Sequence, residues 1–191
     1  MAWGHGGKAV PDDLARLADL LHQRDGLDAK IAQIVGRSAR PGDVGEFIAA
    51  RIFDIELSAS ATQPGYDGTF RSGPQRGKTV NIKTYGDILG GIDIGPHPCD
   101  HYLVLTGPPR KTPAGVRHHP WRITGVYLFD IARLVATLHG RGVKIGIATS
   151  LRKADAEAAR VFPPTGRSPL ALTPEQVALL RLFANEPRAT G

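Results

Sequence analysis

The sequence has a single cysteine, a single methionine and few aromatic residues, which make up 6% of its 191 residues. One cysteine excludes a disulfide within the chain and zinc modules built on four cysteines. No window reaches eighteen consecutive apolar residues, so no membrane-spanning helix is predicted. The opening MAWGHGGKAVPDD has no apolar core of a secretory signal. We therefore expect a cytoplasmic protein without a membrane partner.

Basic residues outnumber acidic residues, 24 against 18, and the formal net charge is +6. An excess of positive charge favours polyanionic partners such as DNA, although the same charge can serve solubility alone. The apolar content of 41% fits a globular core. We predict a flexible N-terminus over residues 1–10 and a single domain over residues 11–187, with its core at about residues 43–150.

The hydrophobic period changes along the chain from helical to alternating and back. Helices are expected at residues 11–26, 27–36, 41–57, 131–140 and 173–186. Strands are expected at residues 65–71, 78–85, 100–107, 121–130 and 142–150. Residues 151–162 fit either a short helix or an irregular segment. The predicted fold class is α/β (α+β), with a small mixed sheet of four to five strands flanked by helices.

Several residues are expected to set the helix ends. Gly26 is predicted to end the first helix, and Asp43 to cap the third. Asp130 is expected to cap the helix at residues 131–140. Thr173 is expected to cap the last helix, with Gln176 in the third position.

A lone aspartate, Asp67, precedes the strand TVNIKTY. Alternation in that strand places Val80 and Ile82 on one face and Asn81 and Lys83 on the other. If the two strands pair as a hairpin across SGPQRG, Asp67 comes beside Asn81 and Lys83, although a slip of one residue would undo this. A carboxylate and an amide oxygen suit magnesium, and an ammonium stabilises charge on phosphate. The triplet therefore suits metal-assisted phosphodiester hydrolysis.

The layout YDG…VNIK resembles the motif of the PD-(D/E)xK nucleases, over about residues 43–130. The resemblance implies a restriction endonuclease-like sheet and a DNA endonuclease that uses magnesium or manganese, with a role in restriction or defence. It implies catalytic roles for Asp67, Asn81 and Lys83, with the Ile82 carbonyl as a further metal ligand. The family's second carboxylate falls at position 81, where this chain has asparagine, so a lower metal affinity is expected.

Glu46, in the segment GEFIAARIF, occupies the place where some nucleases of this superfamily carry a helical glutamate. The resemblance makes it a further catalytic residue and metal ligand. Ala49, Ala50 and Phe53 share its expected helix face, so a partly buried carboxylate is predicted there. The chain also resembles a small bacterial domain family that has no assigned activity. This resemblance lies in the segments GEFIAARIFDI, DGTF and GKTVNIKTY.

Plainer interpretations stay open for each residue. Asp67 can form a turn by bonding to nearby backbone, and Lys83 can be an exposed strand residue. Glu46 can pair with Arg51 or Arg71. The alternative function is a degenerate nuclease-fold module that binds DNA or a protein partner without cleavage, which Asn81 favours. A third candidate function is a scaffold subunit without a nucleic-acid partner.

A nucleic-acid surface is predicted beside the hairpin and in the basic loop that follows residue 107, at Arg71, Arg76, Lys78, Arg110, Lys111, Arg117 and Trp121. Trp121 can equally close the edge of the core. A homodimer is considered, since restriction-like enzymes often pair two subunits, but no stretch marks a dimer surface.

Two further clusters lie near the motif. His97, Cys99 and His101 alternate along an extended segment, so they cannot easily surround one zinc ion. Asp87 and Asp93 follow Lys83 and approach the metal only if their segment folds back.

Overall fold

The structure is a computed structural model that describes residues 12–58, 65–86, 91–107 and 122–184. The chain divides into two compact units, residues 1–44 and 45–191, which are described separately. The first unit contains helix α1 (Asp12–Val35) and the start of α2 (Pro41–Phe53). Helix α1 runs through Gly26, so the predicted break there is wrong. A single glycine costs a helix only about 1 kcal/mol, which the flanking helix formers offset.

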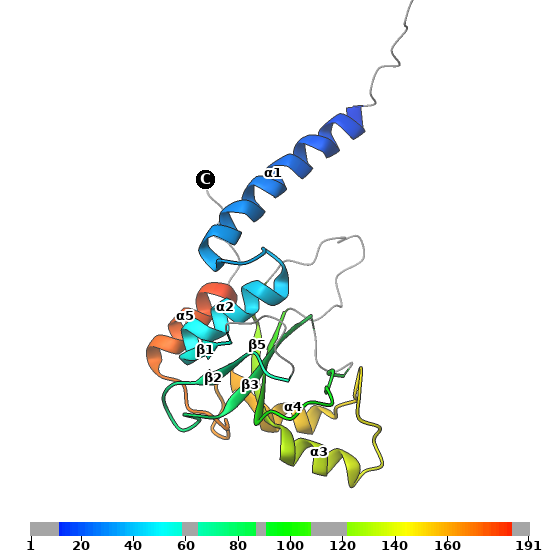
Figure 1. The fold of residues 1–191 in the computed structure, drawn as a ribbon, viewed down its shortest axis with the longest axis vertical. Coiled ribbons are helices and arrows are strands. Elements are labelled where there is room, and N and C mark those ends of the chain that lie inside the picture. The colour runs from blue at the N-terminus through cyan, green and yellow to red at the C-terminus, as the bar shows by residue number, and fades with distance from the viewer. Residues whose placement is uncertain (1–11, 59–64, 87–90, 108–121, 185–191) are drawn as a thin grey trace, which may run out of the picture. The chain divides into compact units, whose positions relative to one another are not determined.

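The second unit is built on one mixed sheet with the strand order β1-β2-β3-β4-β5-β6 (Figure 1). The strands are β1 (Ile55–Leu57), β2 (Gly68–Phe70), β3 (Thr79–Tyr85), β4 (His101–Thr106), β5 (Gly125–Asp130) and β6 (Arg160–Phe162). Among the strands of the described ranges, β3 and β4 pair in parallel and the other neighbours pair antiparallel.

The mixed α/β class is confirmed, but the predicted count of four to five strands is wrong because the sheet has six strands within the described residues. The two edge strands, β1 and β6, have three residues each. Strands that short show no alternation that a sequence pattern can detect. Both follow a helix almost directly, so their residues continue the helical segments of the sequence.

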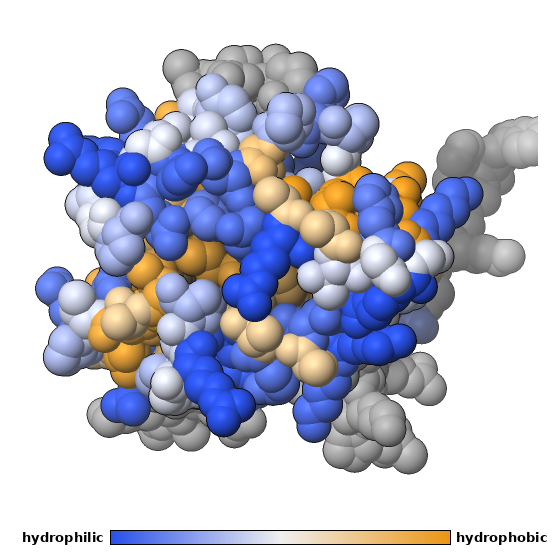
Figure 2. Space-filling model, turned by 90° about the horizontal axis from the view of Figure 1, so that it is seen from below, coloured by the Kyte–Doolittle hydropathy of each residue, from blue (hydrophilic) through white to orange (hydrophobic). Residues whose placement is uncertain are grey.

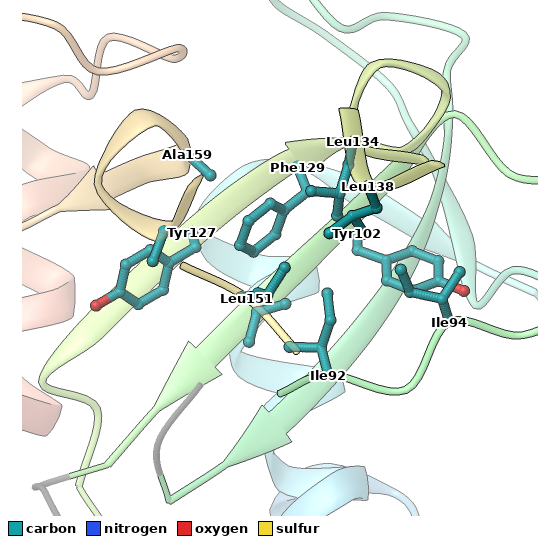
Figure 3. Packing of buried hydrophobic residues seen from close by; sticks show 11 residues of the cluster. Ile92, Ile94, Tyr102, Tyr127, Phe129, Leu134, Leu138, Leu151 and Ala159 are labelled. Carbon is teal, nitrogen blue, oxygen red and sulfur yellow. The ribbon is translucent and has the colours of Figure 1, made fainter. Parts of the chain in front are cut away.

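Helices cover both faces of the sheet (Figure 1). Helices α3 (Ile131–His139) and α4 (Lys153–Ala159) cover the face that carries Tyr102, Tyr127 and Phe129 (Figure 3). Helices α2 and α5 (Pro174–Ala184) lie on the opposite side. We call these two sides the α3 face and the α2 face.

Gly45 brings α2 close to the sheet. A methyl group added at Gly45 would lie 2.1 Å from Oγ1 of Thr84 on β3. Helix α5 is tied to α2 by Nε2 of Gln176, which donates to the carbonyl of Ile52 at 2.8 Å. The α2 face therefore carries the side chains of β3 that alternate with Asn81 and Lys83.

The predicted caps of the later helices are present. Oδ1 of Asp130 accepts the N–H of Arg133 at 3.0 Å at the start of α3. Thr173 and Gln176 exchange two hydrogen bonds, of 3.2 and 3.0 Å, in a capping box. Helix α2 starts at Pro41, so Asp43 lies within its first turn and is not the cap.

Residues 142–150 were expected to form a strand, and that prediction is wrong. Only Thr149 makes an isolated bridge, to Ile92. Gly142 and Gly146 adopt positive φ angles of 68° and 155°, which interrupt extended pairing. Residues 151–162 instead resolve into α4 followed by β6.

Hydrophilic side chains cover much of the surface seen from below, with apolar patches between them (Figure 2). Among the described residues, no helix combines the length and apolarity needed to cross a bilayer.

Candidate functional site

The candidate site lies where β2 ends beside β3. The two strands pair only through Gly68 with Val80 and Thr69 with Thr79. Beyond Val80, the described part of the chain places no strand on that side of β3. Residues 81–85 therefore have an edge that is open within the described ranges, although β3 is an interior strand of the sheet.

Asp67 lies where the chain before β2 diverges from β3. Its N–H donates to the carbonyl of Val80 at 2.9 Å, and its Oδ2 accepts the N–H of Ile82 at 2.6 Å. The carboxylate thus replaces the backbone carbonyl that a longer β2 would supply. This charge-assisted bond fixes the side chain against β3, next to Asn81.

Asn81 presents a buried acceptor at this edge. Its Nδ2 donates to the carbonyl of Gly65 at 3.5 Å, at the limit of a hydrogen bond. Its Oδ1 is buried and has no hydrogen-bond partner among the described residues. A reversed amide would place Oδ1 against the Gly65 carbonyl oxygen, so the observed orientation is favoured. An unmet buried acceptor costs about 1–3 kcal/mol, and a donor or cation is expected beside it.

Lys83 lies on the same side of β3 as Asn81. Its Nζ lies 5.1 Å from the centre of the Tyr102 ring. Asn81 is in register with Tyr102 on β4, which explains why the ring lies on this face. The hydroxyl of Tyr102 accepts the N–H of Gly95 at 3.0 Å and points toward Ile94 (Figure 3). The Tyr102 ring therefore helps to position the Lys83 ammonium on this face.

Cys99 lies within the electrostatic reach of the same residues. Burial raises the pKa of its thiol to about 11; the charges of Asp100 and Asp67 act in the same direction, and that of Lys83 opposes them. Its Sγ donates to the carbonyl of His101 at 3.4 Å. The thiol is therefore protonated at neutral pH, which makes it a weak nucleophile.

The structure does not group Glu46 with these residues. Glu46 is half-buried on α2, directly after Gly45, and that helix packs on the α2 face. Asn81 and Lys83 point to the α3 face, so the helix that carries Glu46 lies on the other side of the sheet. Its expected neighbours Ala49 and Phe53 are buried.

The basic residues beside the hairpin are partly neutralised. Arg71 pairs with Asp54 at 3.6 Å, and Lys78 pairs with Asp100 at 3.1 Å. Arg76 is exposed in the turn. The other residues predicted to bind nucleic acid lie outside the described residues: Arg110, Lys111, Arg117 and Trp121. Asp87 also lies outside them.

The residues PHPCDH do not assemble into a zinc site. His101 is in register with Val80, so it lies on the α2 face, while Cys99 packs against the core of the α3 face. Across the described ranges, no group of three or more His, Cys, Asp or Glu side chains could hold a metal. Asp93 is engaged elsewhere, because its carboxylate accepts the N–H of Ala148 at 2.8 Å and the hydroxyl of Tyr85 at 3.4 Å.

The donor set at the β3 edge fits a loosely held hard cation. It offers one carboxylate, from Asp67, and the unmet amide oxygen of Asn81. Magnesium is commonly held by one or two carboxylates while waters and substrate phosphates complete its shell. These residues suit magnesium or manganese bound together with a phosphate ligand, rather than a closed protein cage.

Tyr102 is the member of the site that sequence reasoning missed. Its position depends on the parallel pairing of β3 with β4, which joins residues about twenty positions apart.

In comparisons with known proteins, no family model and no curated protein matches the chain. The resemblance to PD-(D/E)xK nucleases therefore rests on the motif residues.

Proposed function

We propose that the chain is a divalent-cation-dependent nuclease that hydrolyses phosphodiester bonds in DNA, with its site at Asp67, Asn81 and Lys83. The observation that carries this proposal is the buried, unmet Oδ1 of Asn81 on the same face of β3 as Lys83, one residue before the Ile82 N–H that the Asp67 carboxylate accepts. A carboxylate, a second oxygen and an ammonium are groups that suit metal-assisted phosphodiester hydrolysis.

Each residue has a distinct role in this proposal. Asp67 and Asn81 would hold magnesium or manganese, which supplies charge neutralisation on phosphate and a lowered pKa for water. Lys83 faces the phosphate and stabilises the negative charge that grows as the P–O bond breaks. Tyr102 keeps the Lys83 ammonium over the site through its ring. The net charge of +6 favours a polyanionic substrate.

A DNA-binding module without cleavage is the second candidate. It is favoured by the bond of 2.6 Å between Asp67 and the Ile82 N–H, which gives Asp67 a structural role that needs no metal. It is also favoured by asparagine at position 81, since the site then has one carboxylate. Lys83 would bind phosphate in this module without assisting a reaction.

Calorimetric titration with manganese separates the two candidates. The Asp67→Asn variant keeps an oxygen for the Ile82 N–H but loses the charge. For a nuclease, we expect this variant to bind manganese at least about tenfold more weakly and to lose nicking of supercoiled plasmid. Absence of metal binding and nicking in the unaltered chain at millimolar metal would support the binding module.

Two lysine variants test the role of Lys83. Lys83→Met should abolish nicking while leaving manganese affinity nearly unchanged, because the ammonium acts on phosphate rather than on the cation. Lys153→Met removes an exposed lysine of α4 and should change neither property. Equal nicking by the unaltered chain and by Lys83→Met would mean that a contaminating nuclease produces the signal, and would contradict the proposal.

A further inference from the structure

Within the first unit, helix α1 carries an apolar stripe that no other element of that unit covers. None of its residues is buried, and its large aliphatic side chains are 39% to 71% exposed: Leu14, Leu17, Leu20, Leu21, Leu27, Ile31 and Ile34. Helices in water gain most of their stability by packing such a stripe, since intrinsic propensity leaves them marginal. A helix of 24 residues with this composition therefore needs a partner for its apolar side.

The spacing of the stripe is that of a coiled coil. With Leu17 at position a of a heptad, Leu20, Leu27 and Ile34 occupy the d positions and Ile31 occupies the third a position. Arg24 is the one polar residue in this seam. Leu14 and Leu21 occupy e positions and widen one side of this seam. An apolar a/d repeat of period 3.5 is typical of two helices that supercoil.

We infer that α1 pairs antiparallel with α1 of a second copy of this chain. Placing Leu17 against the partner's Ile34 also sets Leu20 against the partner's Ile31. The same register sets Arg24 against the partner's Leu27, so the two helices overlap over the full seam. Each a residue then meets a d residue, and the two copies bury identical surfaces, as a twofold interface requires.

Arg24 determines the orientation. In a parallel pair, both Arg24 side chains would enter the same layer and two like charges would be buried together. In the antiparallel register, Arg24 lies between the partner's Leu27 and the partner's Asp28. Within its own helix Arg24 already reaches Asp25 at 3.3 Å and Asp28 at 3.9 Å, so acidic side chains flank the seam at this level.

The buried area is sufficient for a dimer. A helix of this length is about 36 Å long. Burying the aliphatic side chains of two copies removes on the order of 1,000 Å² from water, which is the lower limit for a specific interface. The pair is therefore a dimer whose population depends on protein concentration. This inference is independent of the proposed function.

Sedimentation equilibrium of the full chain, from about 1 to about 100 µM, tests the pairing. We expect the unaltered chain to form dimers and Leu27→Glu to weaken them at least tenfold. Ala29→Glu adds the same charge two residues away, at an exposed position outside the seam, and should dimerise like the unaltered chain. A monomer at the highest concentration, or equal dimerisation by Leu27→Glu, would overturn the inference.

Disulfide formation tests the orientation. In an equal mixture, Leu17→Cys chains should crosslink with Ile34→Cys chains more readily than either crosslinks with itself. Preferential crosslinking of Leu17→Cys with itself would show a parallel pair and overturn the antiparallel assignment. Circular dichroism of each variant verifies that the chain stays folded, so loss of pairing is not confused with unfolding.

Discussion

Asn81 is the residue on which metal binding most depends, because it stands where a second carboxylate would strengthen the site. We predict that Asn81→Asp lowers thermal stability without metal, since two neighbouring carboxylates repel. With manganese the same variant should gain more stability than the unaltered chain does, because ligand charge raises affinity. Thermal unfolding with and without manganese measures both effects.

The matched control is Asn81→Leu. It removes the unmet buried acceptor, so we expect this variant to be as stable as the unaltered chain or more so, with no response to manganese. An Asn81→Asp variant that gains no more from manganese than Asn81→Leu would mean that no cation binds at this edge.

Asp100 makes stability depend on acid pH. Its carboxylate accepts the N–H and hydroxyl of Thr79, both at 2.8 Å, and the Lys78 ammonium at 3.1 Å. The Thr79 N–H above all lowers the Asp100 pKa from 3.8 to about 2. Because the folded-state pKa is lowered, this stabilisation is present above pH 4 and is lost as the pH falls toward 2.

We predict a loss of about 1 kcal/mol across that range, reduced by water because the side chain is 37% exposed. Urea unfolding at a series of pH values measures the loss. Asp100→Asn lacks the titrating group, so its stability should decline less between pH 4 and pH 2. An equal decline in both proteins would refute the assignment to Asp100.

At the scale of the secondary-structure elements, two glycines in helices should respond oppositely to alanine. Gly26 lies in α1 with nothing within 4 Å of an added methyl, so Gly26→Ala should stabilise by about 0.5–1 kcal/mol. Gly45 lies in α2, where the methyl would meet Thr84, so Gly45→Ala should destabilise by about 1–3 kcal/mol. Chemical denaturation of the two variants measures the contrast.

The double variant Gly45→Ala/Thr84→Ala identifies the cause. Removing Oγ1 of Thr84 makes room for the methyl, so the two changes together should cost less than the sum of the two changes made singly. Strictly additive costs would show that the close approach of α2 to β3 does not produce the effect.

Local patterns predicted those elements whose signals lie within a few residues. Alternation in TVNIKTY separated Asn81 and Lys83 from Val80, and the turn-rich connection indicated the hairpin that brings Asp67 beside them. The helix caps at Asp130 and Thr173 could be predicted for the same reason. The position of Tyr102 in the site could not be predicted, because it depends on strand pairing across a long stretch of chain. The short strands β1 and β6 carry too few residues to show a period.

At the scale of the whole molecule, the charge of +6 predicts DNA binding that weakens with salt. We expect the affinity for a mixed-sequence duplex to fall by at least tenfold between about 50 and about 200 mM salt, because phosphate contacts release counterions. Fluorescence anisotropy measures the affinity. Lys83→Glu should weaken binding more than Lys144→Glu, which alters an exposed lysine by the same charge. Binding that does not change with salt would argue against a polyanionic partner.

The half-buried thiol of Cys99 has a practical consequence for chemical labelling of the protein. Maleimide and other thiol reagents require the thiolate, and a pKa of about 11 leaves almost none of it at neutral pH. Cysteines introduced on exposed helix positions ionise near their ordinary value and react far faster. Fluorophores or spin labels can therefore be attached at chosen positions while the native cysteine stays in place.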